Sequence, residues 1–181
     1  AQKGSWEFKV YLEHDGQIDF IDSLYFTVNG QNNPPPPAKP SIRFDFNGHN
    51  ANGWTVGYNA TYAAQDQPDV DTWMVVAQGP NPGVISPELP PGFSTSQTPQ
   101  LRFSVKARGL VRQTYGQIWL MDNSGYWGYE MRFTPVKVDY QYHEYAINLS
   151  RLGNIPIRRF SIELTQDAPY EQWIFDWVEL K

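Results

Sequence analysis

One carboxylate stands in the middle of the apolar segment that closes the chain, Trp173–Leu180. This residue is Asp176, and the segment around it has the composition of a buried strand. A buried charge needs a partner, because desolvating it alone costs on the order of several kcal/mol. Candidate partners lie in Phe44–Gly48, where Asp45 and Asn47 supply oxygen atoms. Oxygen ligands shared by the first and last strands of a domain indicate a β-sandwich joined by a hard cation such as calcium.

A second group of residues could bind a sugar. Aromatic residues make up 15% of the 181 residues, with 7 Trp and 11 Tyr, a surplus over what a core needs. We expect Trp119 on the outer face of a sheet, with Ile118 and Leu120 pointing inward. The same alternation places polar or aromatic side chains around it, namely Arg102, Lys106, Tyr115, Gln117, Glu130 and Arg132. An indole that stacks on a pyranose, beside groups that hydrogen bond its hydroxyls, predicts a sugar-binding face.

Two alternatives to this face stay open. A one-residue slip in the alternation would bury Trp119 and expose Ile118, and charged residues also occur on any solvated sheet face. The ligand site could instead lie at a loop end, where Tyr126 and Trp127 follow a turn-forming segment. The remaining alternative is that the chain has no sugar site.

The sequence argues against catalysis. His14, His49 and His143 fall in different expected elements, so they predict no zinc site. No nucleophile elbow and no phosphate-binding loop occurs in the sequence. Glu130 and Glu163 could act as a glycosidase pair only within roughly 5–10 Å of each other across a cleft. Glutamates on open sandwich faces are more often solvated or paired with Arg, so we expect a binding module and not an enzyme.

Composition excludes several other classes. The formal net charge is −5 and basic residues are not clustered, so we expect no nucleic-acid partner. The chain has no Cys, which excludes disulfides, thiolate catalysis and Cys-ligated zinc. No apolar stretch approaches the roughly 20 residues that span a bilayer, so we expect no membrane insertion. A first residue other than Met fits either a processed mature protein or a fragment.

Four consecutive prolines at 34–37 indicate a stiff spacer, and we place a Pro-rich linker at 34–40. Before it, Trp6–Leu12 and Ile18–Val28 are strand-like and are joined by Asp15-Gly16, which is typical of a hairpin. Two strands alone are marginal in water. Residues 1–33 are therefore either a hairpin that docks elsewhere or the C-terminal strands of a larger domain. They resemble the last two strands of an immunoglobulin-like or fibronectin-like domain.

Residues 41–181 are predicted to be all-β, forming an antiparallel β-sandwich of the jelly-roll type. The segment from Gly79 to Pro99 contains six prolines, so we expect an ordered crossing loop there and no central strand. The expected strands cover residues 41–47, 54–64, 72–79, 101–109, 115–122, 127–136, 140–149, 157–166 and 171–180.

The second domain resembles the galactose-binding-like jelly rolls, which include several families of carbohydrate-binding modules. Five short segments carry the resemblance: Phe44–Gly48 followed by Gly53-Trp54, Asn81–Pro87, Leu101–Ala107, His143–Ser150 and Phe175–Leu180. The resemblance implies a structural calcium held by Asp176 and by Asp45 or Asn47, together with backbone carbonyl groups. This chain departs from the family pattern, because Trp177 replaces the second acid of the closing pair and the opening acid aligns with Asn47 in one register.

Two functions follow as hypotheses. In the first, the chain is a non-catalytic carbohydrate-binding domain that anchors a larger extracellular or virion protein to a glycan or polysaccharide. In the second, it is a structural or adhesion module of a multi-domain assembly, such as a phage tail-tip or receptor-binding protein, and contacts protein. Both imply upstream domains and a location outside the cell, at the cell surface or on a virion.

Overall fold

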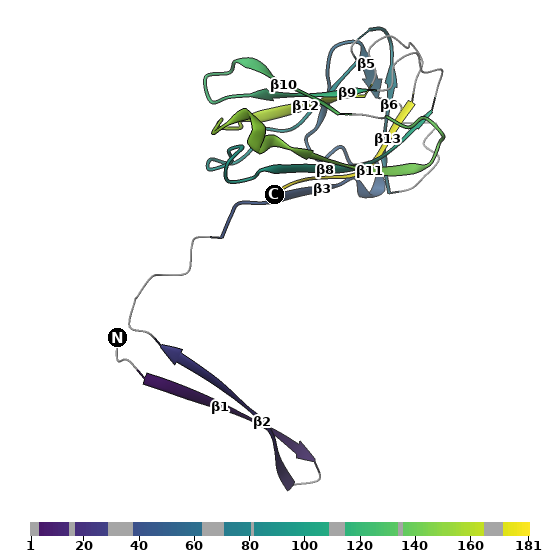
Figure 1. Ribbon diagram of the computed structural model, residues 1–181. Helices are drawn as coiled ribbons and strands as arrows, with labels where there is room; N and C mark the ends of the chain where they lie inside the picture. The colour runs from purple at the N-terminus through teal and green to yellow at the C-terminus, as the bar shows by residue number, and fades with distance from the viewer. Residues whose placement is uncertain are drawn as a thin grey trace. The chain divides into compact units, whose positions relative to one another are not determined.

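The computed structural model describes residues 4–14, 17–28, 38–62, 71–80, 82–108, 115–133, 136–164 and 172–181 (Figure 1). The chain divides into two compact units, Ala1–Ala38 and Lys39–Lys181. Within the described ranges, no helix has the length and the hydrophobicity needed to cross a membrane.

The first unit contains two long antiparallel strands. They are β1 (Gly4–His14) and β2 (Gln17–Val28), with His14 opposite Gln17 and an irregularity in the register between Val10 and Tyr11. The expected Asp15-Gly16 turn and the Pro34–Pro37 run lie outside the described residues. The linker boundaries at 34–40 and the resemblance to an immunoglobulin-like domain stay predictions.

The second unit contains two antiparallel sheets that face each other (Figure 1), which confirms the predicted all-β sandwich. One sheet has five strands. Its order is β10 (Trp127–Phe133), β9 (Gly116–Met121), β12 (Arg159–Glu163), β7 (Val84–Ile85) and β4 (Thr55–Val56).

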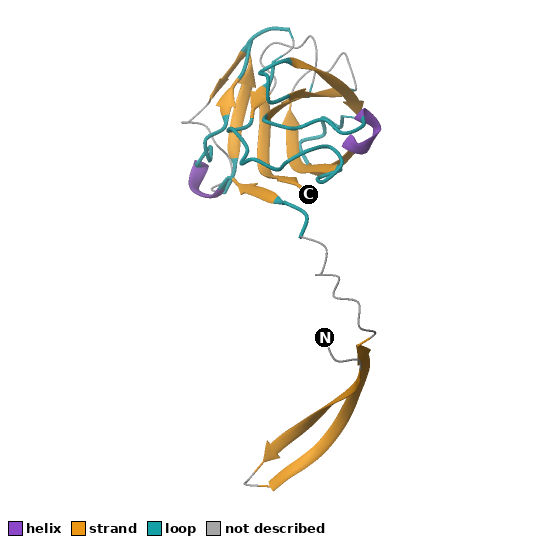
Figure 2. Cartoon of the chain, turned by 90° about the vertical axis from the view of Figure 1, so that its left-hand side faces the viewer, coloured by secondary structure: helices purple, strands orange, loops and turns teal. Residues whose placement is uncertain are grey.

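The other sheet has six strands and contains the closing segment of the chain. Its order is β11 (Tyr142–Asn148), β8 (Gln100–Arg108), β13 (Gln172–Leu180), β6 (Trp73–Ala77) and β5 (Ala60–Tyr62), with β3 (Ile42–Asp45) paired to β13. Short 3-10 turns at Asn47–His49 and Leu149–Leu152 lie at the ends of strands, and Figure 2 shows the described loops between other strands.

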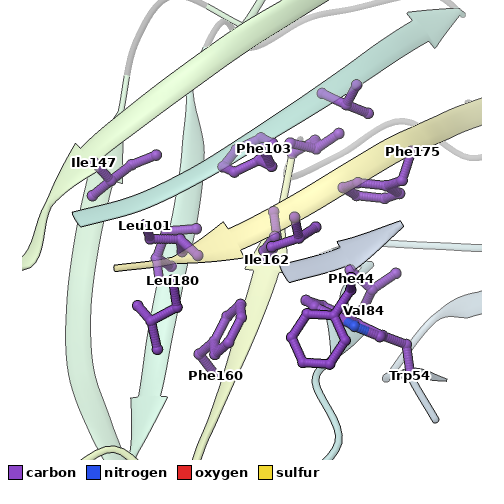
Figure 3. Close-up of a cluster of buried hydrophobic side chains, with 14 of the residues drawn as sticks. Phe44, Trp54, Val84, Leu101, Phe103, Ile147, Phe160, Ile162, Phe175 and Leu180 are labelled. Carbon is purple, nitrogen blue, oxygen red and sulfur yellow. The ribbon is translucent and has the colours of Figure 1, made fainter. Parts of the chain in front are cut away.

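Alternating apolar residues of both sheets fill the space between them. Phe103 and Phe175 from the six-stranded sheet and Phe160 and Ile162 from the five-stranded sheet are fully buried, and Figure 3 shows them in one cluster. The inward orientation of alternate residues fixes what the outer faces can present, because the intervening side chains must point away from the core.

Two strand predictions are wrong in detail. The expected strand at 54–64 is divided into β4 and β5, which belong to different sheets. The chain changes sheets between them at Gly57–Asn59, where Asn59 has a φ of 52°, a left-handed conformation that Asn tolerates better than most residues.

The segment from Gly79 to Pro99 is not only a crossing loop. Its residues Val84 and Ile85 form β7, which pairs with β12 on one side and β4 on the other and is therefore internal to the five-stranded sheet. Proline does not prevent this pairing, because the two residues in the ladder are not prolines and keep their N–H groups.

Candidate functional site

Trp119 lies on the outer face of the five-stranded sheet, on β9, the strand next to the edge strand β10. Its neighbours along β9, Ile118 and Leu120, are fully buried, so the alternation turns the partly exposed indole outward as predicted. In the sheet register Trp119 is opposite Glu130 on β10 and Ser161 on β12. We call this outer surface the Trp119 face.

A row of polar side chains crosses the Trp119 face beside the indole. Gln117 donates through Nε2 to Glu130 Oε1 at 2.5 Å, and Arg132 donates through Nε to the same oxygen at 2.6 Å. These two donors, Arg132 first, hold the pKa of Glu130 below its usual value. The guanidinium of Arg132 also lies 5.1 Å from the ring centre of Tyr115. Four of the other predicted ligand-binding residues are thus on the Trp119 face or beside it, although Gln117 is buried: Tyr115, Gln117, Glu130 and Arg132.

A pocket of about 220 Å³ opens on this face next to Trp119. It brings three aromatic side chains together from β9, from β10 and from the turn after β4. The lining residues are Gly57, Tyr58, Gly83, Ile85, Trp119, Trp127, Ser161 and Glu163. We call it the Trp119 pocket.

Two features of the sequence shape one side of the Trp119 pocket. Gly57 donates its backbone N–H to the carbonyl of Gly83 at 2.7 Å, and a Cβ on Gly57 would lie only 3.0 Å from that oxygen. Glycine therefore permits the close approach of these two backbones. The next residue, Tyr58, is 79% exposed and stands at the edge of the pocket. An aromatic ring left this exposed at a turn is characteristic of a binding surface.

Glu163 is the acidic residue that lines the Trp119 pocket. Burial is the main reason that its pKa is raised to about 7, and the negative charge of Glu130 raises it further. The indole of Trp119 opposes this rise, although its Nε1 is buried and forms no hydrogen bond of standard geometry with a described residue. Glu130 and Glu163 therefore share one face, but only Glu130 is paired with Arg132, and the pKa values of the two carboxyl groups are shifted in opposite directions.

Of the loop-end candidates, Trp127 lies on the Trp119 face, whereas the ring of Tyr126 lies 6.1 Å from that of Tyr129. The Asp122 carboxylate accepts from the backbone N–H of Ser124 at 2.8 Å and of Tyr126 at 3.2 Å, which fixes the turn. Tyr126 is 60% exposed, and a side chain at Gly128 would collide with its ring. Trp127 lines the Trp119 pocket. The loop-end site therefore meets the Trp119 pocket at Trp127.

The predicted placement of Arg102 and Lys106 beside Trp119 is wrong. Both belong to β8, in the six-stranded sheet, so they lie on the opposite outer face of the sandwich. Arg102 donates to Glu144 at 2.9 Å, and its guanidinium lies 5.7 Å from the ring centre of Trp177. Lys106 is only 8% exposed, with its ammonium over the rings of Tyr140 and Tyr142. Alternation along a strand shows which residues point outward, but it does not show to which sheet the strand belongs.

A larger hollow of about 710 Å³ lies at one end of the sandwich. Its lining includes Lys39, Asn148, Ser150 and Lys181, and the described residues around it contribute no aromatic ring. Sugar-binding sites combine an apolar platform with a few polar groups. The smaller Trp119 pocket has this combination, so we take it as the candidate site.

The predicted calcium ligands come from β3, from the turn after it and from β13, which pairs with β3. Asp45 is opposite Trp177 on β13, and its carboxylate accepts from Arg43 Nε at 2.7 Å. The pKa of Asp176 is raised, chiefly by burial, although a hydrogen bond with Ser104 lowers it in part. Among the described residues, no group of three or more acidic or histidine side chains is arranged to hold a metal ion. Calcium at Asp45, Asn47 and Asp176 stays a prediction.

If calcium joins β3 to β13, chelation should lower the melting temperature of the full chain. Binding to the folded state alone would stabilise it by about 2.7 kcal/mol at a hundredfold excess over the dissociation constant. Thermal melting with calcium and with chelator measures the effect. An identical melting temperature, together with elemental analysis that finds no bound metal, would reject the site.

No family model matches this sequence, and no curated protein was found to be similar to it. Solved structures are similar in fold. One is a low-affinity xylan-binding module of family 86 from Roseburia intestinalis, at 18% identity, with 78% of this chain and 95% of that chain covered and a TM-score of 0.50.

Two further similar structures belong to carbohydrate-binding module family 29. One is 13% identical over 78% of this chain and 89% of that chain, with a TM-score of 0.51. The other, a variant complexed with mannohexaose, is 15% identical over 78% of this chain and 92% of that chain, with a TM-score of 0.51. At these identities the similarity establishes the fold, and the chain has the jelly-roll sandwich fold of carbohydrate-binding modules.

Proposed function

We propose that the second unit is a non-catalytic carbohydrate-binding domain that holds a glycan on the Trp119 face. The observation that carries this proposal is the Trp119 pocket, where three aromatic side chains surround a small hollow next to fixed polar groups. The similarity in fold to modules described as xylan-binding or complexed with mannohexaose supports it.

The chemistry of the Trp119 face suits a sugar ring. The faces of Trp119, Tyr58 and Trp127 can stack on the C–H groups of a pyranose, which are its apolar surface. Gln117, which is itself buried, and Arg132 hold the carboxylate of Glu130 in place, so Glu130 offers an oriented acceptor to hydroxyl groups. Preorganised polar groups beside an apolar platform give both affinity and specificity.

The same face is poorly suited to glycoside hydrolysis. Glu130 is paired with Arg132 and Gln117, and that pairing keeps it ionised and oriented along the sheet. A glycosidase needs two carboxyl groups that flank one bond across a cleft. On this face Glu130 and Glu163 lie on strands β10 and β12 of one sheet, with β9 between them. We therefore assign the pair to binding and not to catalysis.

In the proposed setting, the domain anchors a larger extracellular or virion protein to a glycan. The Pro-rich segment at 34–40 would separate the domain from what precedes it, because proline runs favour an extended and stiff conformation. Upstream domains would then carry the other activities of the protein.

A glycan array tests the function directly. The array carries neutral and acidic polysaccharides, including xylan and mannan. The full chain, with a low ratio of label to protein, should be retained by at least one class of polysaccharide. Competition by the free oligosaccharide of that class should release it. If no glycan on a densely coated array retains the protein, the result would contradict the proposed function. It would favour a module that contacts protein.

A further inference from the structure

Glu163 occupies a position that a structural role does not explain. It belongs to β12, which pairs with both β9 and β7 and is therefore internal to the sheet. Its side chain lies against Gly83, where a Cβ would stand only 3.1 Å from Glu163 Cγ. Glu163 nevertheless lines the Trp119 pocket, with its Oε1 3.7 Å from the position of a Cβ on Gly83, another lining residue. The fold therefore directs an acidic side chain into an otherwise largely apolar and aromatic hollow.

The groups around Glu163 disfavour a negative charge. From β9 it faces Gln117 and Trp119, and from β7 and the turn after β4 it faces Ile85 and Tyr58. None of these side chains carries a charge at neutral pH.

The nearest charged groups are on β10. Arg132 is in the same row as Gln117 and Glu163, but its guanidinium is paired with Glu130, whose negative charge acts on Glu163. No positively charged side chain among the described residues lowers the pKa of Glu163. Burial and the neighbouring carboxylate therefore both favour the neutral acid.

We propose that Glu163 contacts the bound sugar as an uncharged carboxylic acid, and that the Trp119 pocket therefore holds one uncharged sugar ring more tightly in mildly acidic than in mildly alkaline solution. This inference rests on the proposed function. A ring placed over the pocket removes the remaining water from the carboxyl group, which costs far more for a charged group than for a neutral one. The neutral acid also supplies one donor and one acceptor to the hydroxyl groups of the sugar.

The size of the pocket sets the size of the ligand. Pockets for drug-sized molecules occupy about 300–1,000 Å³, and the Trp119 pocket is smaller, at about 220 Å³. It therefore accommodates a single ring of an oligosaccharide, with the adjoining rings on the open part of the Trp119 face.

The expected pH dependence follows from the protonated fraction of Glu163. Its pKa of about 7 leaves most molecules neutral at pH 6 and roughly a tenth neutral at pH 8. If the neutral form binds, the apparent dissociation constant is the intrinsic value divided by that fraction. Affinity should therefore fall about tenfold as the pH rises from 6 to 8.

The test is a calorimetric titration of the full chain with mannohexaose and, separately, with xylohexaose at pH 6 and pH 8. The wild-type ratio of the two dissociation constants should be about ten, and Glu163→Gln, which cannot ionise, should reduce it to about one. Glu144→Gln, on the outer face of the other sheet, is the matched control and should keep the wild-type ratio. His49 and His143 contact Thr72 and Asp139, away from this face, so substitution of Glu163 should leave their contacts unchanged.

Melting curves at both pH values show whether each variant is folded. A folded Glu163→Gln that keeps the wild-type ratio, or a wild-type protein that binds equally well or better at pH 8, would overturn this inference alone. If neither hexaose binds, the result would count against the inference on Glu163. If the glycan array also retains no protein, the result would count against the proposed function as well.

Discussion

Trp119→Ala should abolish glycan binding by the full chain while leaving the sandwich folded. The indole is one of the three aromatic rings that line the Trp119 pocket, and its loss removes the platform on which a sugar would stack. Because the indole is only partly buried, truncation should destabilise the fold by less than the about 3–5 kcal/mol typical of a core Trp. Retention on the glycan array measures binding, and denaturant unfolding measures stability.

Arg102→Ala is the matched control for this experiment. Arg102 was expected beside Trp119 from the sequence, but it lies in the six-stranded sheet and pairs with Glu144. Its substitution should leave glycan binding unchanged. A Trp119→Ala variant that is stable and binds normally would reject the site, and loss of binding in Arg102→Ala would place the ligand on the opposite sheet.

Phe46→Ala should cause the largest loss of stability that we predict, about 3–5 kcal/mol. Phe46 is fully buried directly after β3, and its ring centre lies 5.5 Å from that of Trp73 and 6.0 Å from that of Trp54. Its backbone N–H also donates to the carbonyl of Asp176 at 3.2 Å, which ties the start of the domain to the closing strand. Truncation leaves a cavity between aromatic rings that cannot easily collapse.

Tyr58→Ala provides the comparison for Phe46→Ala. This side chain is 79% exposed, so its removal should change the free energy of unfolding by no more than about 0.5 kcal/mol. It should weaken glycan binding, because the ring stands at the edge of the Trp119 pocket. Urea unfolding followed by tryptophan fluorescence distinguishes the two variants. Equal stability of both would show that the aromatic cluster around Phe46 does not hold the sandwich together.

The faces of individual strands could be predicted from the sequence because side chains alternate along a strand. The alternation correctly placed Ile118 and Leu120 in the core and turned Trp119 outward. It also placed Glu130 and Arg132 on the same side as Trp119, since β10 pairs directly with β9. Local pattern is sufficient where consecutive strands are also neighbours in the sheet.

The assignment of strands to sheets could not be predicted in the same way. β8 and β9 follow each other in the sequence but belong to different sheets, and the outward residues of β8 therefore face away from Trp119. The alternation of Arg102, Ser104 and Lys106 does not indicate that the chain passes to the other sheet after β8. The pattern would be identical if β8 belonged to either sheet.

Two residues of the pocket needed the three-dimensional structure to be recognised. Tyr58 was hidden within a segment predicted as one continuous strand, although Gly57 and Asn59 on either side of it are residues that favour turns. From the sequence alone, Glu163 stands out only as one half of a possible glycosidase pair with Glu130. Its role depends on burial by β7 and β9, which are distant from it in the sequence.

The indole N–H signals of the seven Trp residues offer the most direct test that the Trp119 face binds the glycan. Each indole gives one resonance in a nitrogen–proton correlation spectrum, and single substitutions assign them. On titration with the glycan most strongly retained on the array, the signals of Trp119 and Trp127 should shift, whereas that of Trp177, on the other sheet beneath Arg43, should stay in place. A shift of the Trp177 signal with that of Trp119 unchanged, at saturating glycan, would contradict the assignment of the binding face.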